Sequence, residues 1–183
     1  MNDRFFKGTD VSENQWKSHH GPIKVIDFTK TKSLQDSFGA LGCITVLTSN
    51  GKMGTLTHLD TTDKDNIEFF VKALDETLQD NKQDSTVILS GGSKLLDSQN
   101  LVKTIKNEMK NNNYVIIGEY IDNKTFKPNP KITELQKDKI VIRQSVSTLV
   151  DQITEINFAQ GAIKSYTQLQ ELPDFVKRKN LQR

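Results

Sequence analysis

The sequence predicts a single α/β domain of layered α+β type, in which amphipathic helices pack on a mixed sheet that contains a central β-hairpin. Three observations predict this class: apolar and β-branched residues alternate on both sides of Asn50-Gly51, two segments have apolar residues at helical spacing, and short apolar runs separate them. A chain of 183 residues has ordinary single-domain size. We therefore expect one domain over residues 1–183, with a core at 22–145, an N-terminal extension at 1–21 and a basic tail at 173–183.

The central hairpin is predicted between residues 42 and 58. Asn-Gly is the dipeptide best suited to a two-residue type I′ turn, because both of its positions need a positive φ. With Asn50-Gly51 as that turn, Leu47 faces Gly54 and Cys43 faces His58. Facing residues of an antiparallel pair have Cβ atoms about 4.5–5.5 Å apart. The only cysteine of the chain is thus expected to meet one of its three histidines.

A cysteine beside a histidine indicates thiol chemistry. The thiolate is the nucleophilic form of cysteine, and a neighbouring imidazole both lowers the thiol pKa and carries a proton to a leaving group. Backbone N–H groups of the glycines before the Cys43 strand suit an oxyanion hole, or belong only to a flexible turn. An alternative interpretation is that Cys43 is a small buried strand residue and that His58 is a satisfied polar neighbour.

The other elements of the N-terminal half follow from periodicity and turn residues. We expect a strand at 23–28, a connection at 30–41, a helix at 64–79 capped by Thr62 or Asp63, and a strand at 85–90. Gly91-Gly92, after that strand, indicates a tight backbone approach. Asp60 shares the strand parity of His58, so it is a candidate to orient or polarise the imidazole.

The C-terminal half continues the alternation of strands and helices around one predicted sheet. A second helix is expected after a cap at Asp97 or Ser98, followed by a strand at 114–120 and a polar connection with Pro128 and Pro130. A strand at 139–143, a turn of helix from Ser147 and a last hairpin around Gly161 complete the prediction.

Composition excludes several classes of function. A net charge of +2 with 26% charged residues makes no electrostatic case for nucleic acid or a membrane surface as partner. The glycines before Ser93-Lys94 lack the Walker spacing, and Cys43 and the histidines lack zinc-motif spacing, so we expect no cofactor and no metal. The chain has no secretory h-region and no apolar run long enough to span a bilayer, which predicts a soluble cytoplasmic protein.

Two motifs resemble those of a known enzyme superfamily. Residues 57–63, Thr-His-Leu-Asp-Thr-Thr-Asp, resemble the Thr-His-x-Asp-x-Thr-Asp run of protein N-terminal asparagine amidohydrolases, and Ile88-Leu-Ser-Gly-Gly follows at a similar distance. Leu41-Gly42-Cys43 resembles the Leu-Gly-Ser-Cys of CheD-like deamidases and the glycine–cysteine motif of necrotizing-factor-type deamidase toxins. The region from about 37 to 120 therefore resembles the cysteine deamidases, and a CheD-like fold is expected.

This resemblance implies a role for each candidate residue. Cys43 is the expected nucleophile and His58 its base. Ser37, six positions before the cysteine, stands where CheD-like enzymes have a threonine that completes the triad. The supporting residues are Asp60, Gly42, Thr57, Gly91 and Gly92.

The implied activity is hydrolysis of Asn or Gln side-chain amides in a protein or peptide, with release of ammonia and without a cofactor. Within this class, an asparagine amidohydrolase-like enzyme is favoured over a glutamine deamidase toxin or effector, which would act inside a host cell, and over a chemoreceptor-type deamidase. Two other classes stay open: a non-catalytic binding module that retains the Cys–His pair, and a thiol enzyme that transfers an acyl group or cleaves an isopeptide.

Overall fold

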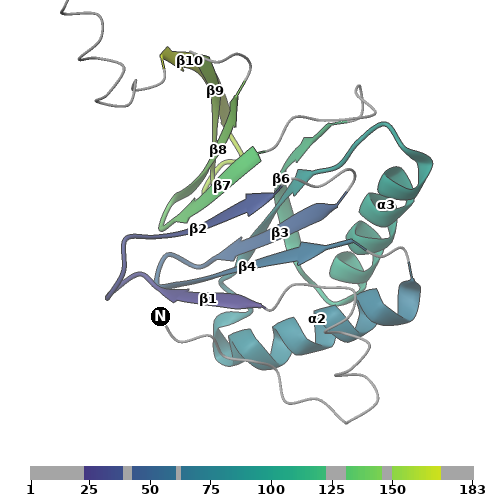
Figure 1. Cartoon of the computed structure of the whole chain (residues 1–183). Helices are drawn as coiled ribbons and strands as arrows, with labels where there is room; N and C mark the ends of the chain where they lie inside the picture. Colours follow the sequence, from purple (N-terminus) through teal and green to yellow (C-terminus); the bar gives the residue numbers. More distant parts are fainter. Residues whose placement is uncertain (1–22, 39–42, 61–62, 123–130, 146–149, 170–183) are drawn as a thin grey trace, which may run out of the picture.

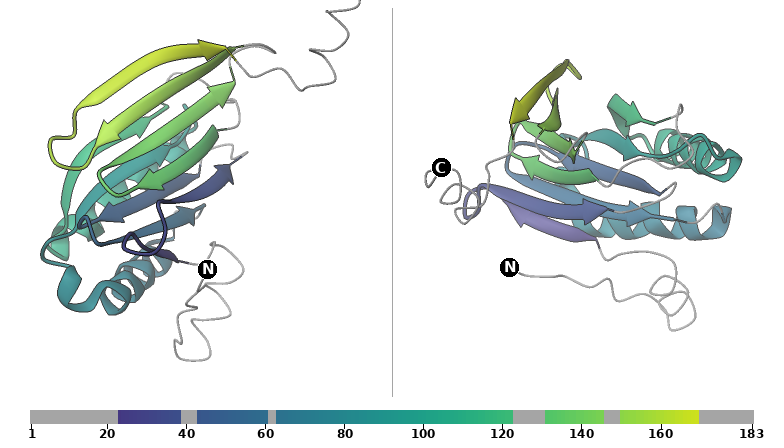
Figure 2. Two further views of the ribbon diagram at one scale, coloured as in Figure 1. Left: turned by 90° about the vertical axis from the view of Figure 1, so that its left-hand side faces the viewer. Right: turned by 45° about the horizontal axis from the view of Figure 1, so that its top comes forward.

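The computed structural model describes residues 23–38, 43–60, 63–122, 131–145 and 150–169. Within these residues the protein is a mixed α+β structure with two five-stranded sheets and two α-helices. The two helices cover one face of the first sheet, sheet A, and the second sheet, sheet B, covers its other face (Figures 1 and 2). The prediction of helices packed on a sheet with a central hairpin is confirmed, whereas the prediction of one sheet is wrong.

Sheet A has the strand order β1-β4-β3-β5-β6. Its strands are β1 (Lys24–Asp27), β3 (Ile44–Ser49), β4 (Met53–Leu59), β5 (Thr86–Gly91) and β6 (Val115–Ile121). All of them were expected from the sequence. Only β5 and β6 are parallel, and a helix joins them, as a parallel connection requires.

Sheet B is antiparallel and has the order β10-β9-β8-β7-β2. Its strands are β2 (Ser33–Phe38), β7 (Lys131–Gln136), β8 (Lys139–Ser145), β9 (Val150–Asn157) and β10 (Ile163–Leu169). The strand near 139–143 and the last hairpin are confirmed. The connection expected at 30–41 is instead strand β2 over part of its length, and β7 was missed altogether.

The polar sequence of β2 explains that error. Ser-Leu-Gln-Asp-Ser-Phe has no clear apolar alternation, so its strand structure depends on pairing with β7 about a hundred residues later in the chain. The turn of helix expected from Ser147 begins outside the described residues, and the chain from Val150 onward is strand β9.

The two helices follow their apolar periodicity. Helix α2 (Lys64–Leu78) begins at Asp63, whose carboxylate accepts a hydrogen bond from the N–H of Asp65, and continues into the 3₁₀ turn η1 (Gln79–Asn81). Helix α3 (Leu96–Asn111) has Leu95 as its N-cap without a side-chain bond, so the prediction that Asp97 or Ser98 caps it is wrong. Ser98 instead accepts a hydrogen bond from the Ser93 N–H at 2.9 Å.

Strand β3 lies between two hydrophobic cores, and all six of its residues are buried. Ile44 and Val46 point to the core between sheet A and the helices, while Leu47 points to the core between the sheets. A strand covered on both faces needs apolar residues at successive positions, which is why β3 and β5 read as nearly continuous apolar runs.

The hairpin between β3 and β4 has a different register from the predicted one. Leu47 pairs with Leu56 and Thr45 pairs with His58, so the partner of each β3 residue is shifted by two positions along β4. Gly51 has a φ of 78°, but Asn50 is not among the residues with positive φ, which excludes a type I′ turn. The Asn50 side-chain oxygen instead accepts the N–H groups of Lys52 and Met53 at 2.9 and 2.7 Å.

The β9–β10 turn contacts sheet A through Gly161. A Cβ atom at this position would lie 1.9 Å from the carbonyl oxygen of Ile117 in β6, and the residue has a φ of 62°. Gly51 has a similar φ, but its Cβ would meet nothing nearer than 4.0 Å. Gly161 therefore combines a left-handed backbone with a close approach between the two sheets.

We expect Gly161→Ala to destabilise the protein by about 2–4 kcal/mol, since the turn must move away from β6, and the matched change Gly51→Ala to cost only about 1 kcal/mol. Denaturant unfolding of both variants measures the difference. Equal losses in the two variants would contradict the close packing at Gly161.

Candidate functional site

Cys43 lies directly before β3, at one end of sheet A. Its carbonyl oxygen accepts the N–H of Gly92 at 2.8 Å, which extends the β3–β5 ladder by one residue pair beyond Ile44 and Gly91. Strand alternation therefore places Cys43 on the same face as Thr45 and Leu47, the face toward sheet B. The residue is partly exposed, so the thiol stands at a boundary between the interior and solvent.

His58 lies on this same face of β4 but does not face Cys43. It pairs with Thr45, so Cys43 is its diagonal neighbour, and the predicted direct pairing is wrong. The shift by two residues preserves the face, because side chains alternate with a period of two. Diagonal neighbours have a typical separation of about 7–8 Å, which long side chains span. A cysteine and a histidine thus share one end of one sheet face.

A row of polar residues crosses the sheet at the level of His58. The pairings place His58, Thr45, Ser90 and Tyr120 side by side on four adjacent strands. Thr45 and Ser90 are 4% and 1% exposed, and Tyr120 packs against the core between the sheets. Sequence reasoning did not identify Thr45, Ser90 or Tyr120 as site residues, because only the pairing of distant strands aligns them.

Asp60 acts on the Cys43 thiol through its charge, and its predicted role beside the imidazole stays a prediction. Continuing the β3–β4 register by one pair places Asp60 opposite Cys43. Burial, and then the charge of Asp60, raise the pKa of the Cys43 thiol to about 11. The resting thiol is therefore protonated at neutral pH, in contrast to the lowered pKa expected from an adjacent imidazole.

Gly91 and Gly92 form the backbone support of Cys43, as their tight approach in the sequence predicts. Gly91 has a φ of 116°, and a Cβ atom there would lie 2.5 Å from the Cys43 carbonyl oxygen. At Gly92 a Cβ atom would lie 3.0 Å from Ile121 and 3.3 Å from the Ser98 hydroxyl. Larger residues at Gly91 would push the cysteine away from β5.

The structure does not bring Thr57 and Ser37 to this face. Thr57 pairs with Val46 and so belongs to the helix side of sheet A, and its buried hydroxyl has no hydrogen-bond partner among the described residues. Ser37 is in β2, where it pairs with Ile132 of sheet B, rather than in the sheet that carries Cys43 and His58. Gly42 lies outside the described residues.

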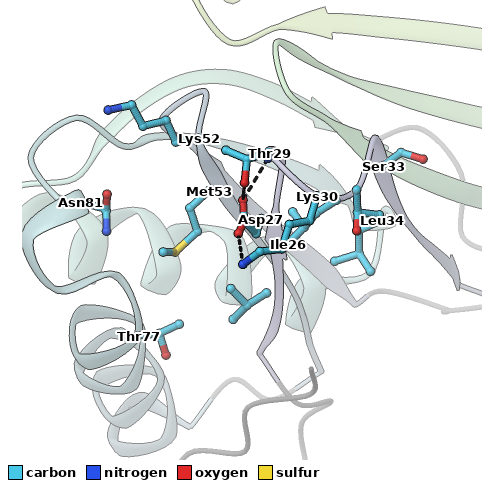
Figure 3. A pocket seen from close by; sticks show the side chains of 12 residues that line it. Ile26, Asp27, Thr29, Lys30, Ser33, Leu34, Lys52, Met53, Thr77 and Asn81 are labelled. Atoms are coloured by element: carbon cyan, nitrogen blue, oxygen red, sulfur yellow. Dashed lines mark hydrogen bonds and ion pairs between the residues drawn. The ribbon is translucent and has the colours of Figure 1, made fainter. Parts of the chain in front are cut away.

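A second feature lies at the opposite end of sheet A. A cavity of about 620 Å³ opens beside β1, the hairpin turn and the end of α2 (Figure 3).

Among the described residues, no group of three or more His, Cys, Asp or Glu side chains is arranged to hold a metal ion. The helices that the structure describes are all too short or too polar to cross a membrane.

We expect Asp60→Asn to lower the pKa of the Cys43 thiol below about 11, because it removes the negative charge that opposes ionisation. Alkylation of the single cysteine by iodoacetamide at pH 8 should become roughly threefold to tenfold faster. In the native protein the rate should keep rising toward pH 11, since thiolate forms only as the pH approaches the pKa.

Asp84→Asn is the matched control, because Asp84 is exposed and remote in sequence from the cysteine. It should leave the pH profile of alkylation unchanged. A native midpoint near the ordinary thiol value of about 8.5 would show that Asp60 and burial do not control the thiol.

Comparisons with known proteins identify no relative of this chain. The chain matches no family model, no curated protein and no solved structure.

Proposed function

We propose that the protein is a cysteine-dependent amidohydrolase that converts Asn or Gln side-chain amides of a protein or peptide to Asp or Glu, with release of ammonia. The observation that carries this proposal is the position of Cys43 and His58 on one face of adjacent strands, at an end of the sheet where the thiol is partly exposed. The motif resemblance around Thr57–Asp63 favours an asparagine amide, as in protein N-terminal asparagine amidohydrolases, within a CheD-like superfamily. On this proposal the enzyme acts in the cytoplasm, or inside a host cell if it is an effector.

The raised thiol pKa decides how the first step proceeds. Because the resting thiol is protonated, His58 has to take the Sγ proton as the Sγ–C bond forms, so that the amide oxygen becomes an oxyanion. Collapse of the tetrahedral adduct breaks the C–N bond, and the imidazolium returns the proton to the departing ammonia. This leaves a thioester on Cys43.

Hydrolysis of the thioester completes the cycle. A water attacks the thioester carbonyl while His58 accepts its proton, the C–S bond breaks, and the imidazolium returns the proton to sulfur. The product is the free side-chain carboxylic acid, and neither a redox step nor a cofactor is required. Thr45 and Ser90 lie beside His58 in the polar row, so they are its nearest polar neighbours along that row.

The proposal predicts ammonia release from a peptide set that contains N-terminal Asn, internal Asn and internal Gln. Cys43→Ser should reduce the rate by about 10³-fold or more, since the thiolate is a far better nucleophile than an alkoxide. His58→Ala should reduce it by about 10²-fold or more, because the proton transfers lose their carrier. A coupled ammonia assay, with mass spectrometry of the peptide, measures both.

Asp84→Asn serves as the control for altered charge, and circular dichroism verifies that each variant is folded. Undiminished ammonia release by folded Cys43→Ser protein would refute the thiol mechanism. A peptide product that carries a transferred group, in place of a free acid, would show acyl transfer instead of hydrolysis.

One observation favours a second candidate, a non-catalytic binding module that retains the Cys–His pair. A thiol pKa of about 11 is what an unreactive structural cysteine has. This candidate predicts no ammonia release from any peptide of the set, together with slow alkylation of Cys43 that His58→Ala does not alter. Alkylation that does depend on His58 would exclude it.

A further inference from the structure

Strand β1 forms an edge of sheet A at which backbone groups point away from the sheet. The N–H of Phe28 donates to the carbonyl of Lys52 at 2.8 Å, so the hydrogen-bonded pairs of β1 and β4 are Phe28–Lys52, Ile26–Gly54 and Lys24–Leu56. The intervening residues Val25 and Asp27 therefore direct their N–H and C=O groups outward. The Asp27 carbonyl accepts the N–H groups of Lys30 and Thr31. Three outward groups then have no partner among the described residues: the N–H and C=O of Val25 and the N–H of Asp27.

The cavity beside β1 lies along this edge and touches both faces of the sheet. On the helix side it is lined by Val25 and Met53, which pack on the helix-side core, and by Thr77 of α2. On the other side it is lined by Ile26 and Leu34, which belong to the core between the sheets. Figure 3 labels Met53 and Thr77 on one side and Ile26 and Leu34 on the other. A strand added to the edge would place successive side chains alternately on the two sides.

The charges of the cavity favour an acidic occupant. Asp27 is neutralised by Lys30, whose ammonium lies 2.7 Å from its carboxylate, and hydrogen bonds from Lys30 and Thr29 lower the pKa of Asp27 to about 2. Lys52 also lines the cavity, is exposed, and has no carboxylate partner among the described residues. One lining cation is thus uncompensated where the hairpin turn meets β1.

We propose that the outer edge of β1 binds an extended acidic peptide segment by strand addition. The peptide backbone would hydrogen-bond to Val25 and Asp27, and an acidic side chain of the peptide would pair with the ammonium of Lys52. Exposed sheet edges are templates for such pairing, and lined pockets supply its side-chain specificity. A small anionic ligand would use Lys52 but not the outward backbone groups. Asp27 pairs with Met53, five residues from His58 along β4, so this edge lies about 17 Å from the candidate catalytic residues. The inference does not depend on the proposed function.

The first test is amide hydrogen exchange on the full chain, resolved by residue. In the free protein the N–H groups of Val25 and Asp27 should exchange faster than those of Ile26 and Phe28, which are bonded to β4. A fluorescein-labelled octapeptide in which glutamate alternates with valine should slow the exchange of the Val25 and Asp27 N–H groups, and of no other β1 N–H group. Protection of the Val25 N–H in the free protein would overturn the proposal, since the edge would then already be occupied. Protection that rises with protein concentration would identify a second copy of the chain as the occupant, and protection independent of concentration would identify the chain itself.

The second test is fluorescence anisotropy with the same peptide. Val25→Pro removes an outward N–H without removing a β1–β4 bond, and should weaken binding at least about tenfold, whereas Val25→Thr should not. Lys52→Glu should weaken binding of the glutamate peptide and strengthen binding of the same peptide with lysine in place of glutamate. Two further peptides carry N-methyl groups at alternate residues, one at the odd and one at the even positions. Only one of them should bind, because strand addition uses the N–H groups of every second peptide residue, and this tests backbone pairing even if Val25→Pro does not fold. Absence of binding, or equal binding of both N-methylated parities, would overturn the proposal.

Discussion

The register of the β3–β4 hairpin decides which side chains meet at the candidate site. Asn50 folds the turn by accepting two N–H groups with its side chain. Ser49 accepts the Gly51 N–H and donates to the carbonyl of Lys137, in the turn between β7 and β8. Further along the hairpin, the hydroxyls of Thr48 and Thr55 lie 2.8 Å apart across the pair. These bonds align Leu47 with Leu56 in the core, and the same alignment places Thr45 opposite His58 and Asp60 opposite Cys43.

The layered architecture explains why the site lies at the end of a strand. Strand β3 is covered on both faces, so all six of its residues are buried. Cys43, one residue before the strand, is the first position at which the chain emerges, and Gly91 with Gly92 holds it against β5 by backbone contact. The protein thus combines a rigid backbone at the cysteine with partial access to its side chain, a combination that a catalytic nucleophile needs.

The electrostatics of this end of the sheet oppose ionisation of the cysteine. Burial and the charge of Asp60 raise the pKa of the thiol, so in the proposed mechanism His58 takes the proton from sulfur as sulfur attacks the amide. The candidate recognition edge at β1 is at the other end of the same sheet. If both proposals hold, a protein substrate would bind at β1 by a segment remote from the amide that reacts, so recognition and chemistry would lie at different ends of the sheet.

The sequence by itself determined both helices, the five strands of sheet A, the last hairpin, and the shared face of Cys43 and His58. These follow from local periodicity: a helix or strand pattern extends over neighbouring residues, and an error of two positions in register leaves a face unchanged. Only the tertiary structure decided that the strands form two sheets, that Ser37 belongs to the second, that Thr57 faces the helices and that Asp60 opposes the cysteine. Those outcomes depend on pairing between segments far apart in the chain, such as β2 with β7, and on side-chain bonds in the turn that outweigh the usual preference of Asn-Gly.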